Sequence, residues 1–153
     1  MDEYAVQFNA VLVDTYRSVL RVEERTLRSI QNINLSISEM HMLEVVGKNK
    51  EMGAKIGEIA RELGIAMPSV TVGINKLMKK GYVQKVKSSG DGRMVYVTLT
   101  RLGKKMDSVH RHFHEQMVHS VVKDFTNEEK VTLLRGLKKL NSYLKQKIAE
   151  MEA

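Results

Sequence analysis

The sequence predicts a mainly α-helical protein with one small β-hairpin. Apolar residues recur at helical spacing in two long segments, 3–30 and 126–151, near the two ends of the chain. Between them, two short helical segments precede two alternating stretches that are joined by serine and glycine. With 153 residues, 42% of them hydrophobic, the chain is long enough for one core, and we expect a single domain over 1–153.

Composition and motifs exclude several classes of protein. The chain has no cysteine, which excludes disulfides, a cysteine nucleophile and a CxxC metal knuckle. It has no glycine-rich phosphate loop, GxSxG elbow, HExxH or kinase signature, so we expect no enzyme. No apolar run approaches roughly 18 residues, and the N-terminus does not resemble a signal peptide. We therefore expect a cytoplasmic protein that does not bind membranes.

Positive charge is concentrated in the middle of the chain. The formal net charge is +7, but residues 54–111 contain 12 Lys and Arg against 4 Asp and Glu, a net of +8, which leaves −1 for the rest. Such a block can be a solvated face, or it can bind a polyanion such as nucleic acid.

The first part of the chain predicts one long helix and one short one. The long helix is expected over 3–30, with an apolar stripe at Ala5, Phe8, Val11, Leu12, Val19, Leu20, Val22, Leu27 and Ile30. In "SEMHMLEVVGK", Ser38 is the expected N-cap of the short helix, which ends near Gly47.

The stretch "KIGEIARELGIAMPSVTVGINKLMKKGYV" predicts a helix-turn-helix. A helix over Lys55–Leu63 is followed by Gly64 as C-cap and by a second helix that Pro68 and Ser69 open. The expected buried residues are Ile59, Ala60 and Leu63 in the first helix and Val70, Ile74, Leu77 and Met78 in the second. The expected outward face of the second helix is Ser69, Thr71, Val72, Gly73, Asn75, Lys76, Lys79 and Lys80. Small residues near its start and lysines near its end suit a helix in the major groove of DNA.

Two alternating stretches, "YVQKVK" and "MVYVTL", flank the turn "SSGDG" and predict a hairpin directly after this helix. The fold class is therefore a winged helix-turn-helix. Wing residues expected at the DNA are Lys87, Ser89, Asp91 and Arg93, with Arg93 in the minor groove and Asp91 orienting its guanidinium. An ordinary surface pair of Asp91 and Arg93 is the alternative.

The C-terminal segment predicts a third long helix. Thr126 and Glu129 form a capping box, and one stripe contains Leu133, Leu134, Leu137, Leu140, Leu144, Ile148 and Met151. We expect the two long arms to pack on each other and on a second subunit, as a homodimer; the alternative is that they cover each other within one chain.

The segments "IGEIARELGI", "VTVGINKLMKKGYV", Asp91-Gly92-Arg93 and "LTRLGKK" resemble the MarR family of bacterial transcription regulators. The resemblance implies dimerisation helices at 1–35 and 105–153, a winged helix-turn-helix lobe at 37–104, a recognition helix at 68–80 and a wing at 82–99. It also implies a two-fold dimer on double-stranded DNA with a palindromic operator. Many relatives have an arginine where this chain has Val72 or Gly73, which favours contact with a thymine methyl here.

The segments "SISEMHMLEVVGK" and "HRHFHEQMV" resemble the branch of this family that represses fatty-acid synthesis genes. That resemblance implies a long-chain acyl group on acyl carrier protein as co-repressor, and no required cofactor. An apolar cavity for the acyl chain would be lined by Met40, Leu43, Met106, Val109, Phe113 and Met117; the same residues can equally be plain core.

The histidines raise a second possibility. His110 and His114 are four residues apart on one helical face, His41 lies on the short helix, and Glu23 or Glu24 could complete a tetrahedral zinc site. These positions are similar to those of zinc-sensing MarR members. A hydrogen-bonded histidine cluster without metal is the alternative, and a small aromatic effector is a further one.

Overall fold

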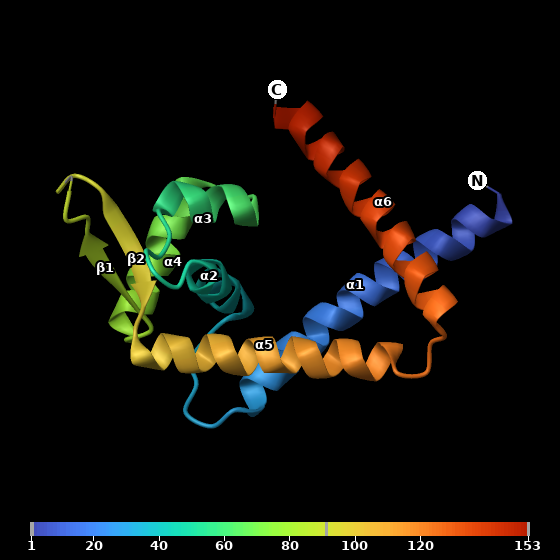
Figure 1. Cartoon of the computed structure of the whole chain (residues 1–153), viewed down its shortest axis with the longest axis horizontal. Helices are drawn as coiled ribbons and strands as arrows, with labels where there is room; N and C mark the ends of the chain where they lie inside the picture. Colours follow the sequence, from blue (N-terminus) through green and yellow to red (C-terminus); the bar gives the residue numbers. More distant parts are fainter. Residues whose placement is uncertain (1, 91, 153) are drawn as a thin grey trace. The chain divides into compact units, whose positions relative to one another are not determined.

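The computed structural model describes residues 2–90 and 92–152. Residues 1–110 and 111–153 form two compact units, and each is described by itself. The mainly α-helical class with a two-stranded wing is confirmed, in the element order shown in Figure 1. The elements are α1 (Glu3–Ser29), α2 (Ile37–Lys48), α3 (Ile56–Leu63), α4 (Met67–Lys79), β1 (Val83–Lys87), β2 (Val95–Leu99), α5 (Arg101–Val122) and α6 (Asn127–Glu152).

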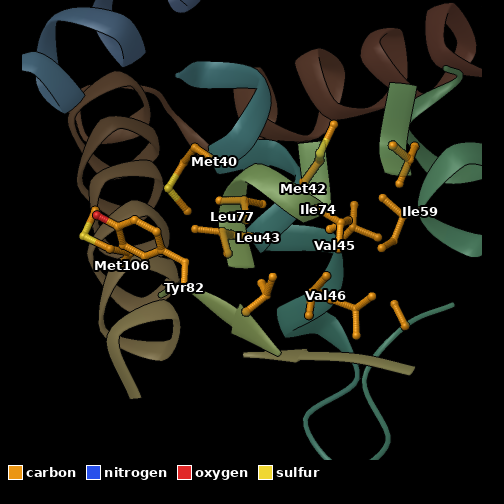
Figure 2. Packing of buried hydrophobic residues seen from close by; sticks show 14 of the residues in the cluster. Met40, Met42, Leu43, Val45, Val46, Ile59, Ile74, Leu77, Tyr82 and Met106 are labelled. Carbon is orange, nitrogen blue, oxygen red and sulfur yellow. The ribbon is translucent and has the colours of Figure 1, made fainter. Parts of the chain in front are cut away.

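The hydrophobic core of the first unit is built around α2. Met40 and Leu43 of α2 are fully buried, together with Ile59 of α3 and Ile74 and Leu77 of α4. Figure 2 shows these side chains converging from the three helices, with Tyr82 and Met106 at the edge of the same cluster. This packing sets the position of α4 relative to α2 and α3.

Helix α2 begins two residues earlier than the sequence analysis expected. The N-cap is Ser36 rather than Ser38. The Glu39 backbone N–H donates to Ser36 Oγ at 3.2 Å, and the Ser36 backbone N–H donates to Glu39 Oε2 at 2.8 Å. This reciprocal capping box satisfies the backbone N–H groups of Ser36 and Glu39, which explains why the helix starts after Ser36.

The predicted helix-turn-helix is confirmed. Lys55 caps α3, Gly64 ends it in the left-handed region with φ 63°, and Pro68 lies in the first turn of α4. Within α4, Val70, Ile74 and Leu77 are buried as expected.

Two predictions about the faces of α4 were wrong. Met78 is 38% exposed instead of packed, because the core already contacts the helix through Ile74 and Leu77. Gly73 is buried instead of facing outward. It lies against α2 so closely that a Cβ at Gly73 would come within 2.5 Å of Met42 Sδ, and glycine therefore permits the close approach of the two helices.

The hairpin is antiparallel, as predicted. Val83 pairs with Leu99 and Lys87 with Val95, and the Ser88 N–H donates to Met94 O at 2.9 Å to close the turn. Ala54 adds a short bridge to Val97, with backbone hydrogen bonds of 2.9 and 2.8 Å, which the sequence analysis did not anticipate. This bridge attaches the wing to the segment that leads into α3.

The long helices expose apolar side chains. Near the C-terminal end of α1, Leu27 is buried, and in α6 none of the described residues is buried. The exposed apolar residues of these two helices include Phe8, Val11, Leu20, Val22, Leu133, Leu134, Leu137, Leu144, Ile148 and Met151. The expected cap of α6 is confirmed, since Thr126 and Glu129 hydrogen-bond reciprocally at 2.7 and 3.2 Å. Among the described residues, no helix has the length and apolar character needed to cross a membrane.

A substitution at Gly103, near the start of α5, tests how closely this helix packs against Tyr82 at the start of the wing. A Cβ at Gly103 would lie 2.0 Å from the Tyr82 carbonyl oxygen, which also accepts the Thr100 N–H, so the backbone itself would have to move. We expect Gly103→Ala to lower the free energy of unfolding by about 2 kcal/mol or more. Gly57→Ala is the matched control, because its Cβ would meet only Met67 Cε at 4.0 Å. Urea unfolding of both variants measures the difference, and equal stabilities would contradict the described contact.

Candidate nucleic-acid interface

The exposed side of α4 contains most of the residues that the sequence assigned to DNA contact. Ser69, Thr71, Val72, Asn75, Lys76 and Lys79 are all exposed, and Val72 is 55% exposed despite being apolar. Thr71, Asn75 and Lys79 are spaced four residues apart and therefore form one ridge along the helix. The ridge is polar near the start of α4 and basic near its end.

Two side chains of this ridge make specific hydrogen bonds. The Thr71 hydroxyl donates to the Met67 carbonyl one turn earlier at 3.1 Å, so its oxygen can still accept a hydrogen bond. Lys85 Nζ, from strand β1, donates to Asn75 Oδ1 at 3.2 Å. The wing therefore contacts α4 directly at a residue of the outward face that the sequence predicted.

Lys80, the C-cap of α4, differs from the lysines within the helix because it is half-buried and paired inside the protein. Its Nζ donates to both carboxylate oxygens of Glu39 at 2.8 Å, and Glu39 is only 6% exposed. Burial alone would raise the pKa of Glu39, but the hydrogen bond and charge of Lys80, with hydrogen bonds from Ser36, hold it below its ordinary value. Much of the Lys80 charge is therefore compensated by α2.

The wing presents its predicted residues at its tip. Lys87, Ser89 and Arg93 are exposed, on and beyond the ends of the two strands. Asp91 lies outside the described residues, so its predicted pairing with Arg93 stays a prediction. Behind the wing, Lys55 Nζ lies 5.5 Å from the centre of the Tyr96 ring, a cation–π contact between the start of α3 and β2.

The residues of the predicted acyl pocket are divided between the two units. Met40, Leu43 and Met106 pack in the core of the first unit, where Figure 2 shows them. Val109, also in the first unit, is 38% exposed. Phe113 and Met117 belong to the second unit, and both are half-buried.

Three of the four predicted zinc ligands lie together in the first unit. His41 Nε2 is 3.5 Å from Glu23 Oε2, and His110 Nε2 is 3.6 Å from Glu23 Oε1. Ligand atoms of Glu23, His41 and His110 all lie within 4.8 Å of one another. Glu23 and His110 are buried, and His41 is half-buried. His114, the fourth, belongs to the second unit and is half-buried.

Two residues at these sites were missed in the sequence analysis. Glu44 Oε2 lies 4.0 Å from His110 Nδ1, and the spacing His41-x-x-Glu44 on one helical face was a signal that could have found it. Lys85 had no such signal, because strand alternation places it on a face without naming the helix that this face meets.

Comparisons with known proteins agree with this geometry. A sequence model described as the MarR family matches residues 33–94. The crystal structure of Streptococcus pneumoniae FabT in complex with DNA is 31% identical, and the match covers 93% of this chain and 98% of FabT, with a TM-score of 0.87.

Two further relatives extend the comparison. YhjH of Bacillus subtilis, a helix-turn-helix-type transcriptional regulator, is 31% identical over 98 residues, which span 62% of this chain and 55% of YhjH. The crystal structure of the zinc-dependent MarR family regulator AdcR in the Zn(II)-bound state is 25% identical; the match covers 94% of this chain and 99% of AdcR, with a TM-score of 0.64. YhjH and AdcR are both described as transcription regulators.

The buried pair of Glu39 and Lys80 makes stability depend on pH. A carboxyl whose pKa is lower in the folded than in the unfolded protein contributes stability above its unfolded pKa and loses it as the pH falls through its folded pKa. We expect Glu39→Gln to lower the free energy of unfolding by about 1.5–3 kcal/mol at neutral pH, and the deficit to shrink below the ordinary carboxyl pKa of 4.5. Glu58→Gln, at the same capping-box position of α3, is the matched control and should change little. Urea titrations from about pH 7 to pH 3 measure both variants, and a pH-independent deficit for Glu39→Gln would contradict the ion pair.

Proposed function

This chain belongs to the MarR family of DNA-binding transcription regulators, and we propose that it is a homodimeric repressor of fatty-acid synthesis genes. The similarity to FabT carries this proposal, because it extends over nearly the whole of both chains and includes the arms as well as the winged lobe. The FabT structure was solved on DNA, which supports duplex DNA as the ligand of this chain too.

The proposed DNA complex uses the two exposed surfaces of the first unit. Helix α4 enters the major groove with the ridge of Thr71, Asn75 and Lys79, and Val72 contacts a thymine methyl. The wing places Arg93 in the adjacent minor groove, where a narrow A·T-rich groove attracts arginine. Lys76, Lys79 and Lys87 are exposed cations that suit phosphate contacts.

The proposed dimer covers the apolar side chains of the long helices. Leu134, Leu137 and Leu144 of α6 are each about half exposed in the single chain, and Val11 and Val22 of α1 are 65% and 46% exposed. Such regular apolar stripes are unfavourable in water and are typical of subunit interfaces. A two-fold dimer presents two α4 helices, so the proposed operator is palindromic with half-sites one helical turn apart.

The proposed effector is a long-chain acyl group delivered by acyl carrier protein. Met40, Leu43 and Met106 are tightly packed, so an acyl chain that enters among them has to displace core side chains of α2. Helix α2 also contacts α4 through Met42 at Gly73 and through Glu39 at Lys80. A shift of α2 therefore changes the position of α4, which supports coupling between effector and DNA.

Affinity for the duplex upstream of fatty-acid synthesis genes tests this function. We expect two chains per duplex, and tighter binding with the acylated carrier protein than with the bare one. Arg93→Ala should weaken binding about tenfold while keeping the fold, whereas Lys123→Ala, an exposed cation outside the winged lobe, should not. Titration by fluorescence anisotropy measures the affinity of the wild-type protein and of both variants for the duplex. An affinity that is the same with the acylated and the bare carrier protein would contradict the proposed effector. An Arg93→Ala affinity equal to that of the wild type would contradict the proposed contact of the wing with DNA.

The cluster of Glu23, His41 and His110 supports a second candidate function, regulation by zinc. Tetrahedral zinc with bonds of about 2.0–2.2 Å holds its ligand atoms roughly 3.3–3.6 Å apart. Each histidine lies 3.5 or 3.6 Å from a different oxygen of Glu23, and the three ligand atoms lie within 4.8 Å of one another, so a bound ion would draw them slightly closer together. The ligand types are those that zinc prefers. Glu23, His41 and His110 would hold the ion and link α1, α2 and α5. His114 as fourth ligand rests on the sequence spacing.

Zinc binding is measurable without DNA. Zinc at about one hundred times its dissociation constant should raise the free energy of unfolding by about 2.7 kcal/mol relative to chelated protein. His110→Gln should abolish this gain, and His119→Gln, which replaces an exposed histidine, should retain it. An unchanged wild-type stability on addition of zinc would identify the cluster as an ordinary polar contact between helices.

A further inference from the structure

We propose that Asn75 and Lys85 act together to read guanine in the major groove. This inference rests on the proposed DNA binding by α4 and adds to it the base that the contact prefers. Asn75 is exposed on the ridge of α4, and Lys85 reaches it from β1, with Nζ 3.2 Å from Oδ1. Lys85 was not among the residues that the sequence assigned to DNA.

The contact determines which way the Asn75 amide faces. A lysine ammonium has three donors and no acceptor, so its partner on asparagine has to be the carbonyl oxygen and not the amide nitrogen. The Asn75 NH2 group is therefore the part of the amide that remains for the DNA. Two N–H donor groups, Asn75 Nδ2 and Lys85 Nζ, then lie next to each other on the exposed side of the first unit.

This arrangement disfavours adenine. Asparagine reads adenine by accepting a hydrogen bond from N6 while it donates to N7. Here the accepting oxygen already faces a positive charge, which repels the partly positive hydrogens of an amino group. The same repulsion applies to the N4 amino group of cytosine, which is the hydrogen-bonding group of cytosine in the major groove.

Guanine is the base whose major-groove edge offers two adjacent acceptors, N7 and O6, and no donor. One donor from Asn75 and one from Lys85 match that edge. At the neighbouring positions of α4, Gly73 is buried and Val72 is apolar, so neither side chain can donate a hydrogen bond to guanine. Guanine recognition in this chain then comes from a pair of residues on two elements.

Selection of duplexes from a randomised pool tests the pair. The wild-type protein should enrich guanine at one position of each half-site, and Lys85→Met, which keeps the aliphatic stem, should reduce the guanine-over-adenine preference there about tenfold. Lys87→Met is the matched control, because Lys87 lies two residues further on the same face of β1 and is also exposed. It should weaken binding to all sequences about equally and keep the preference.

A second variant reverses the chemistry at Asn75. Asn75→Asp has the same shape and retains an acceptor for Lys85, but it replaces the outward donor with an acceptor, so the protein should lose its preference for guanine at that position. A guanine preference that Asn75→Asp retains overturns the pair. Circular dichroism and thermal unfolding establish that each variant folds.

The possible outcomes distinguish a failure of the Asn75–Lys85 pair from a failure of the proposed operator binding. A guanine preference that Lys85→Met leaves intact, or a loss of affinity that is equal for all sequences, overturns the Asn75–Lys85 pair and leaves the regulator unaffected. A wild-type protein that enriches no sequence overturns the proposed operator binding and the pair with it.

Discussion

The buried ion pair between Glu39 and Lys80 is the constraint on which the geometry of the first unit depends. Glu39 closes the capping box that starts α2, and both of its carboxylate oxygens also accept hydrogen bonds from Nζ of Lys80, the C-cap of α4. A buried carboxylate without a cation is strongly unfavourable, so the two helix ends have to stay together. The contact of Met42 with Gly73 fixes the middle of the same helix pair by close packing. Together they define the angle at which α4 presents its exposed ridge.

Helix α2 is also where both proposed effectors would act. Its successive residues face different neighbours: Glu39 and Met42 contact α4, Met40 and Leu43 fill the core, and His41 faces Glu23. Because a helix turns by about 100° per residue, five consecutive side chains point around most of its circumference. A ligand that moves α2 from either the apolar or the histidine side therefore displaces α4, since close-packed interiors transmit such shifts.

Some lysines of the winged lobe are exposed, and others are hydrogen-bonded to side chains of the protein. Lys76 and Lys79 are exposed and available to phosphates, whereas Lys80 is compensated by Glu39 and Lys85 is bound to Asn75. Net charge alone thus overstates the number of phosphate contacts, and with it the salt dependence that the sequence suggests. The lysines that make internal hydrogen bonds instead join α2 and β1 to α4, which presents the predicted reading face.

The sequence by itself determined the order of the elements, the helix-turn-helix, the hairpin and the buried faces at Ile59, Val70 and Ile74. These features depend on apolar periodicity, on Gly64 and on turn residues, all of which are local. It also grouped His41, His110 and His114 with Glu23 or Glu24, from helical spacing and family resemblance, and the structure brings Glu23, His41 and His110 together.

Only the tertiary structure decided the partners of individual side chains. The pairing of Lys80 with Glu39 joins residues 41 positions apart, that of Lys85 with Asn75 joins a strand to a helix, and the burial of Gly73 depends on Met42. A linear pattern records the face on which a residue lies but not the element that this face meets. Which lysines remain for DNA is therefore a property of packing, since each contact depends on the crossing of two elements that the sequence does not specify.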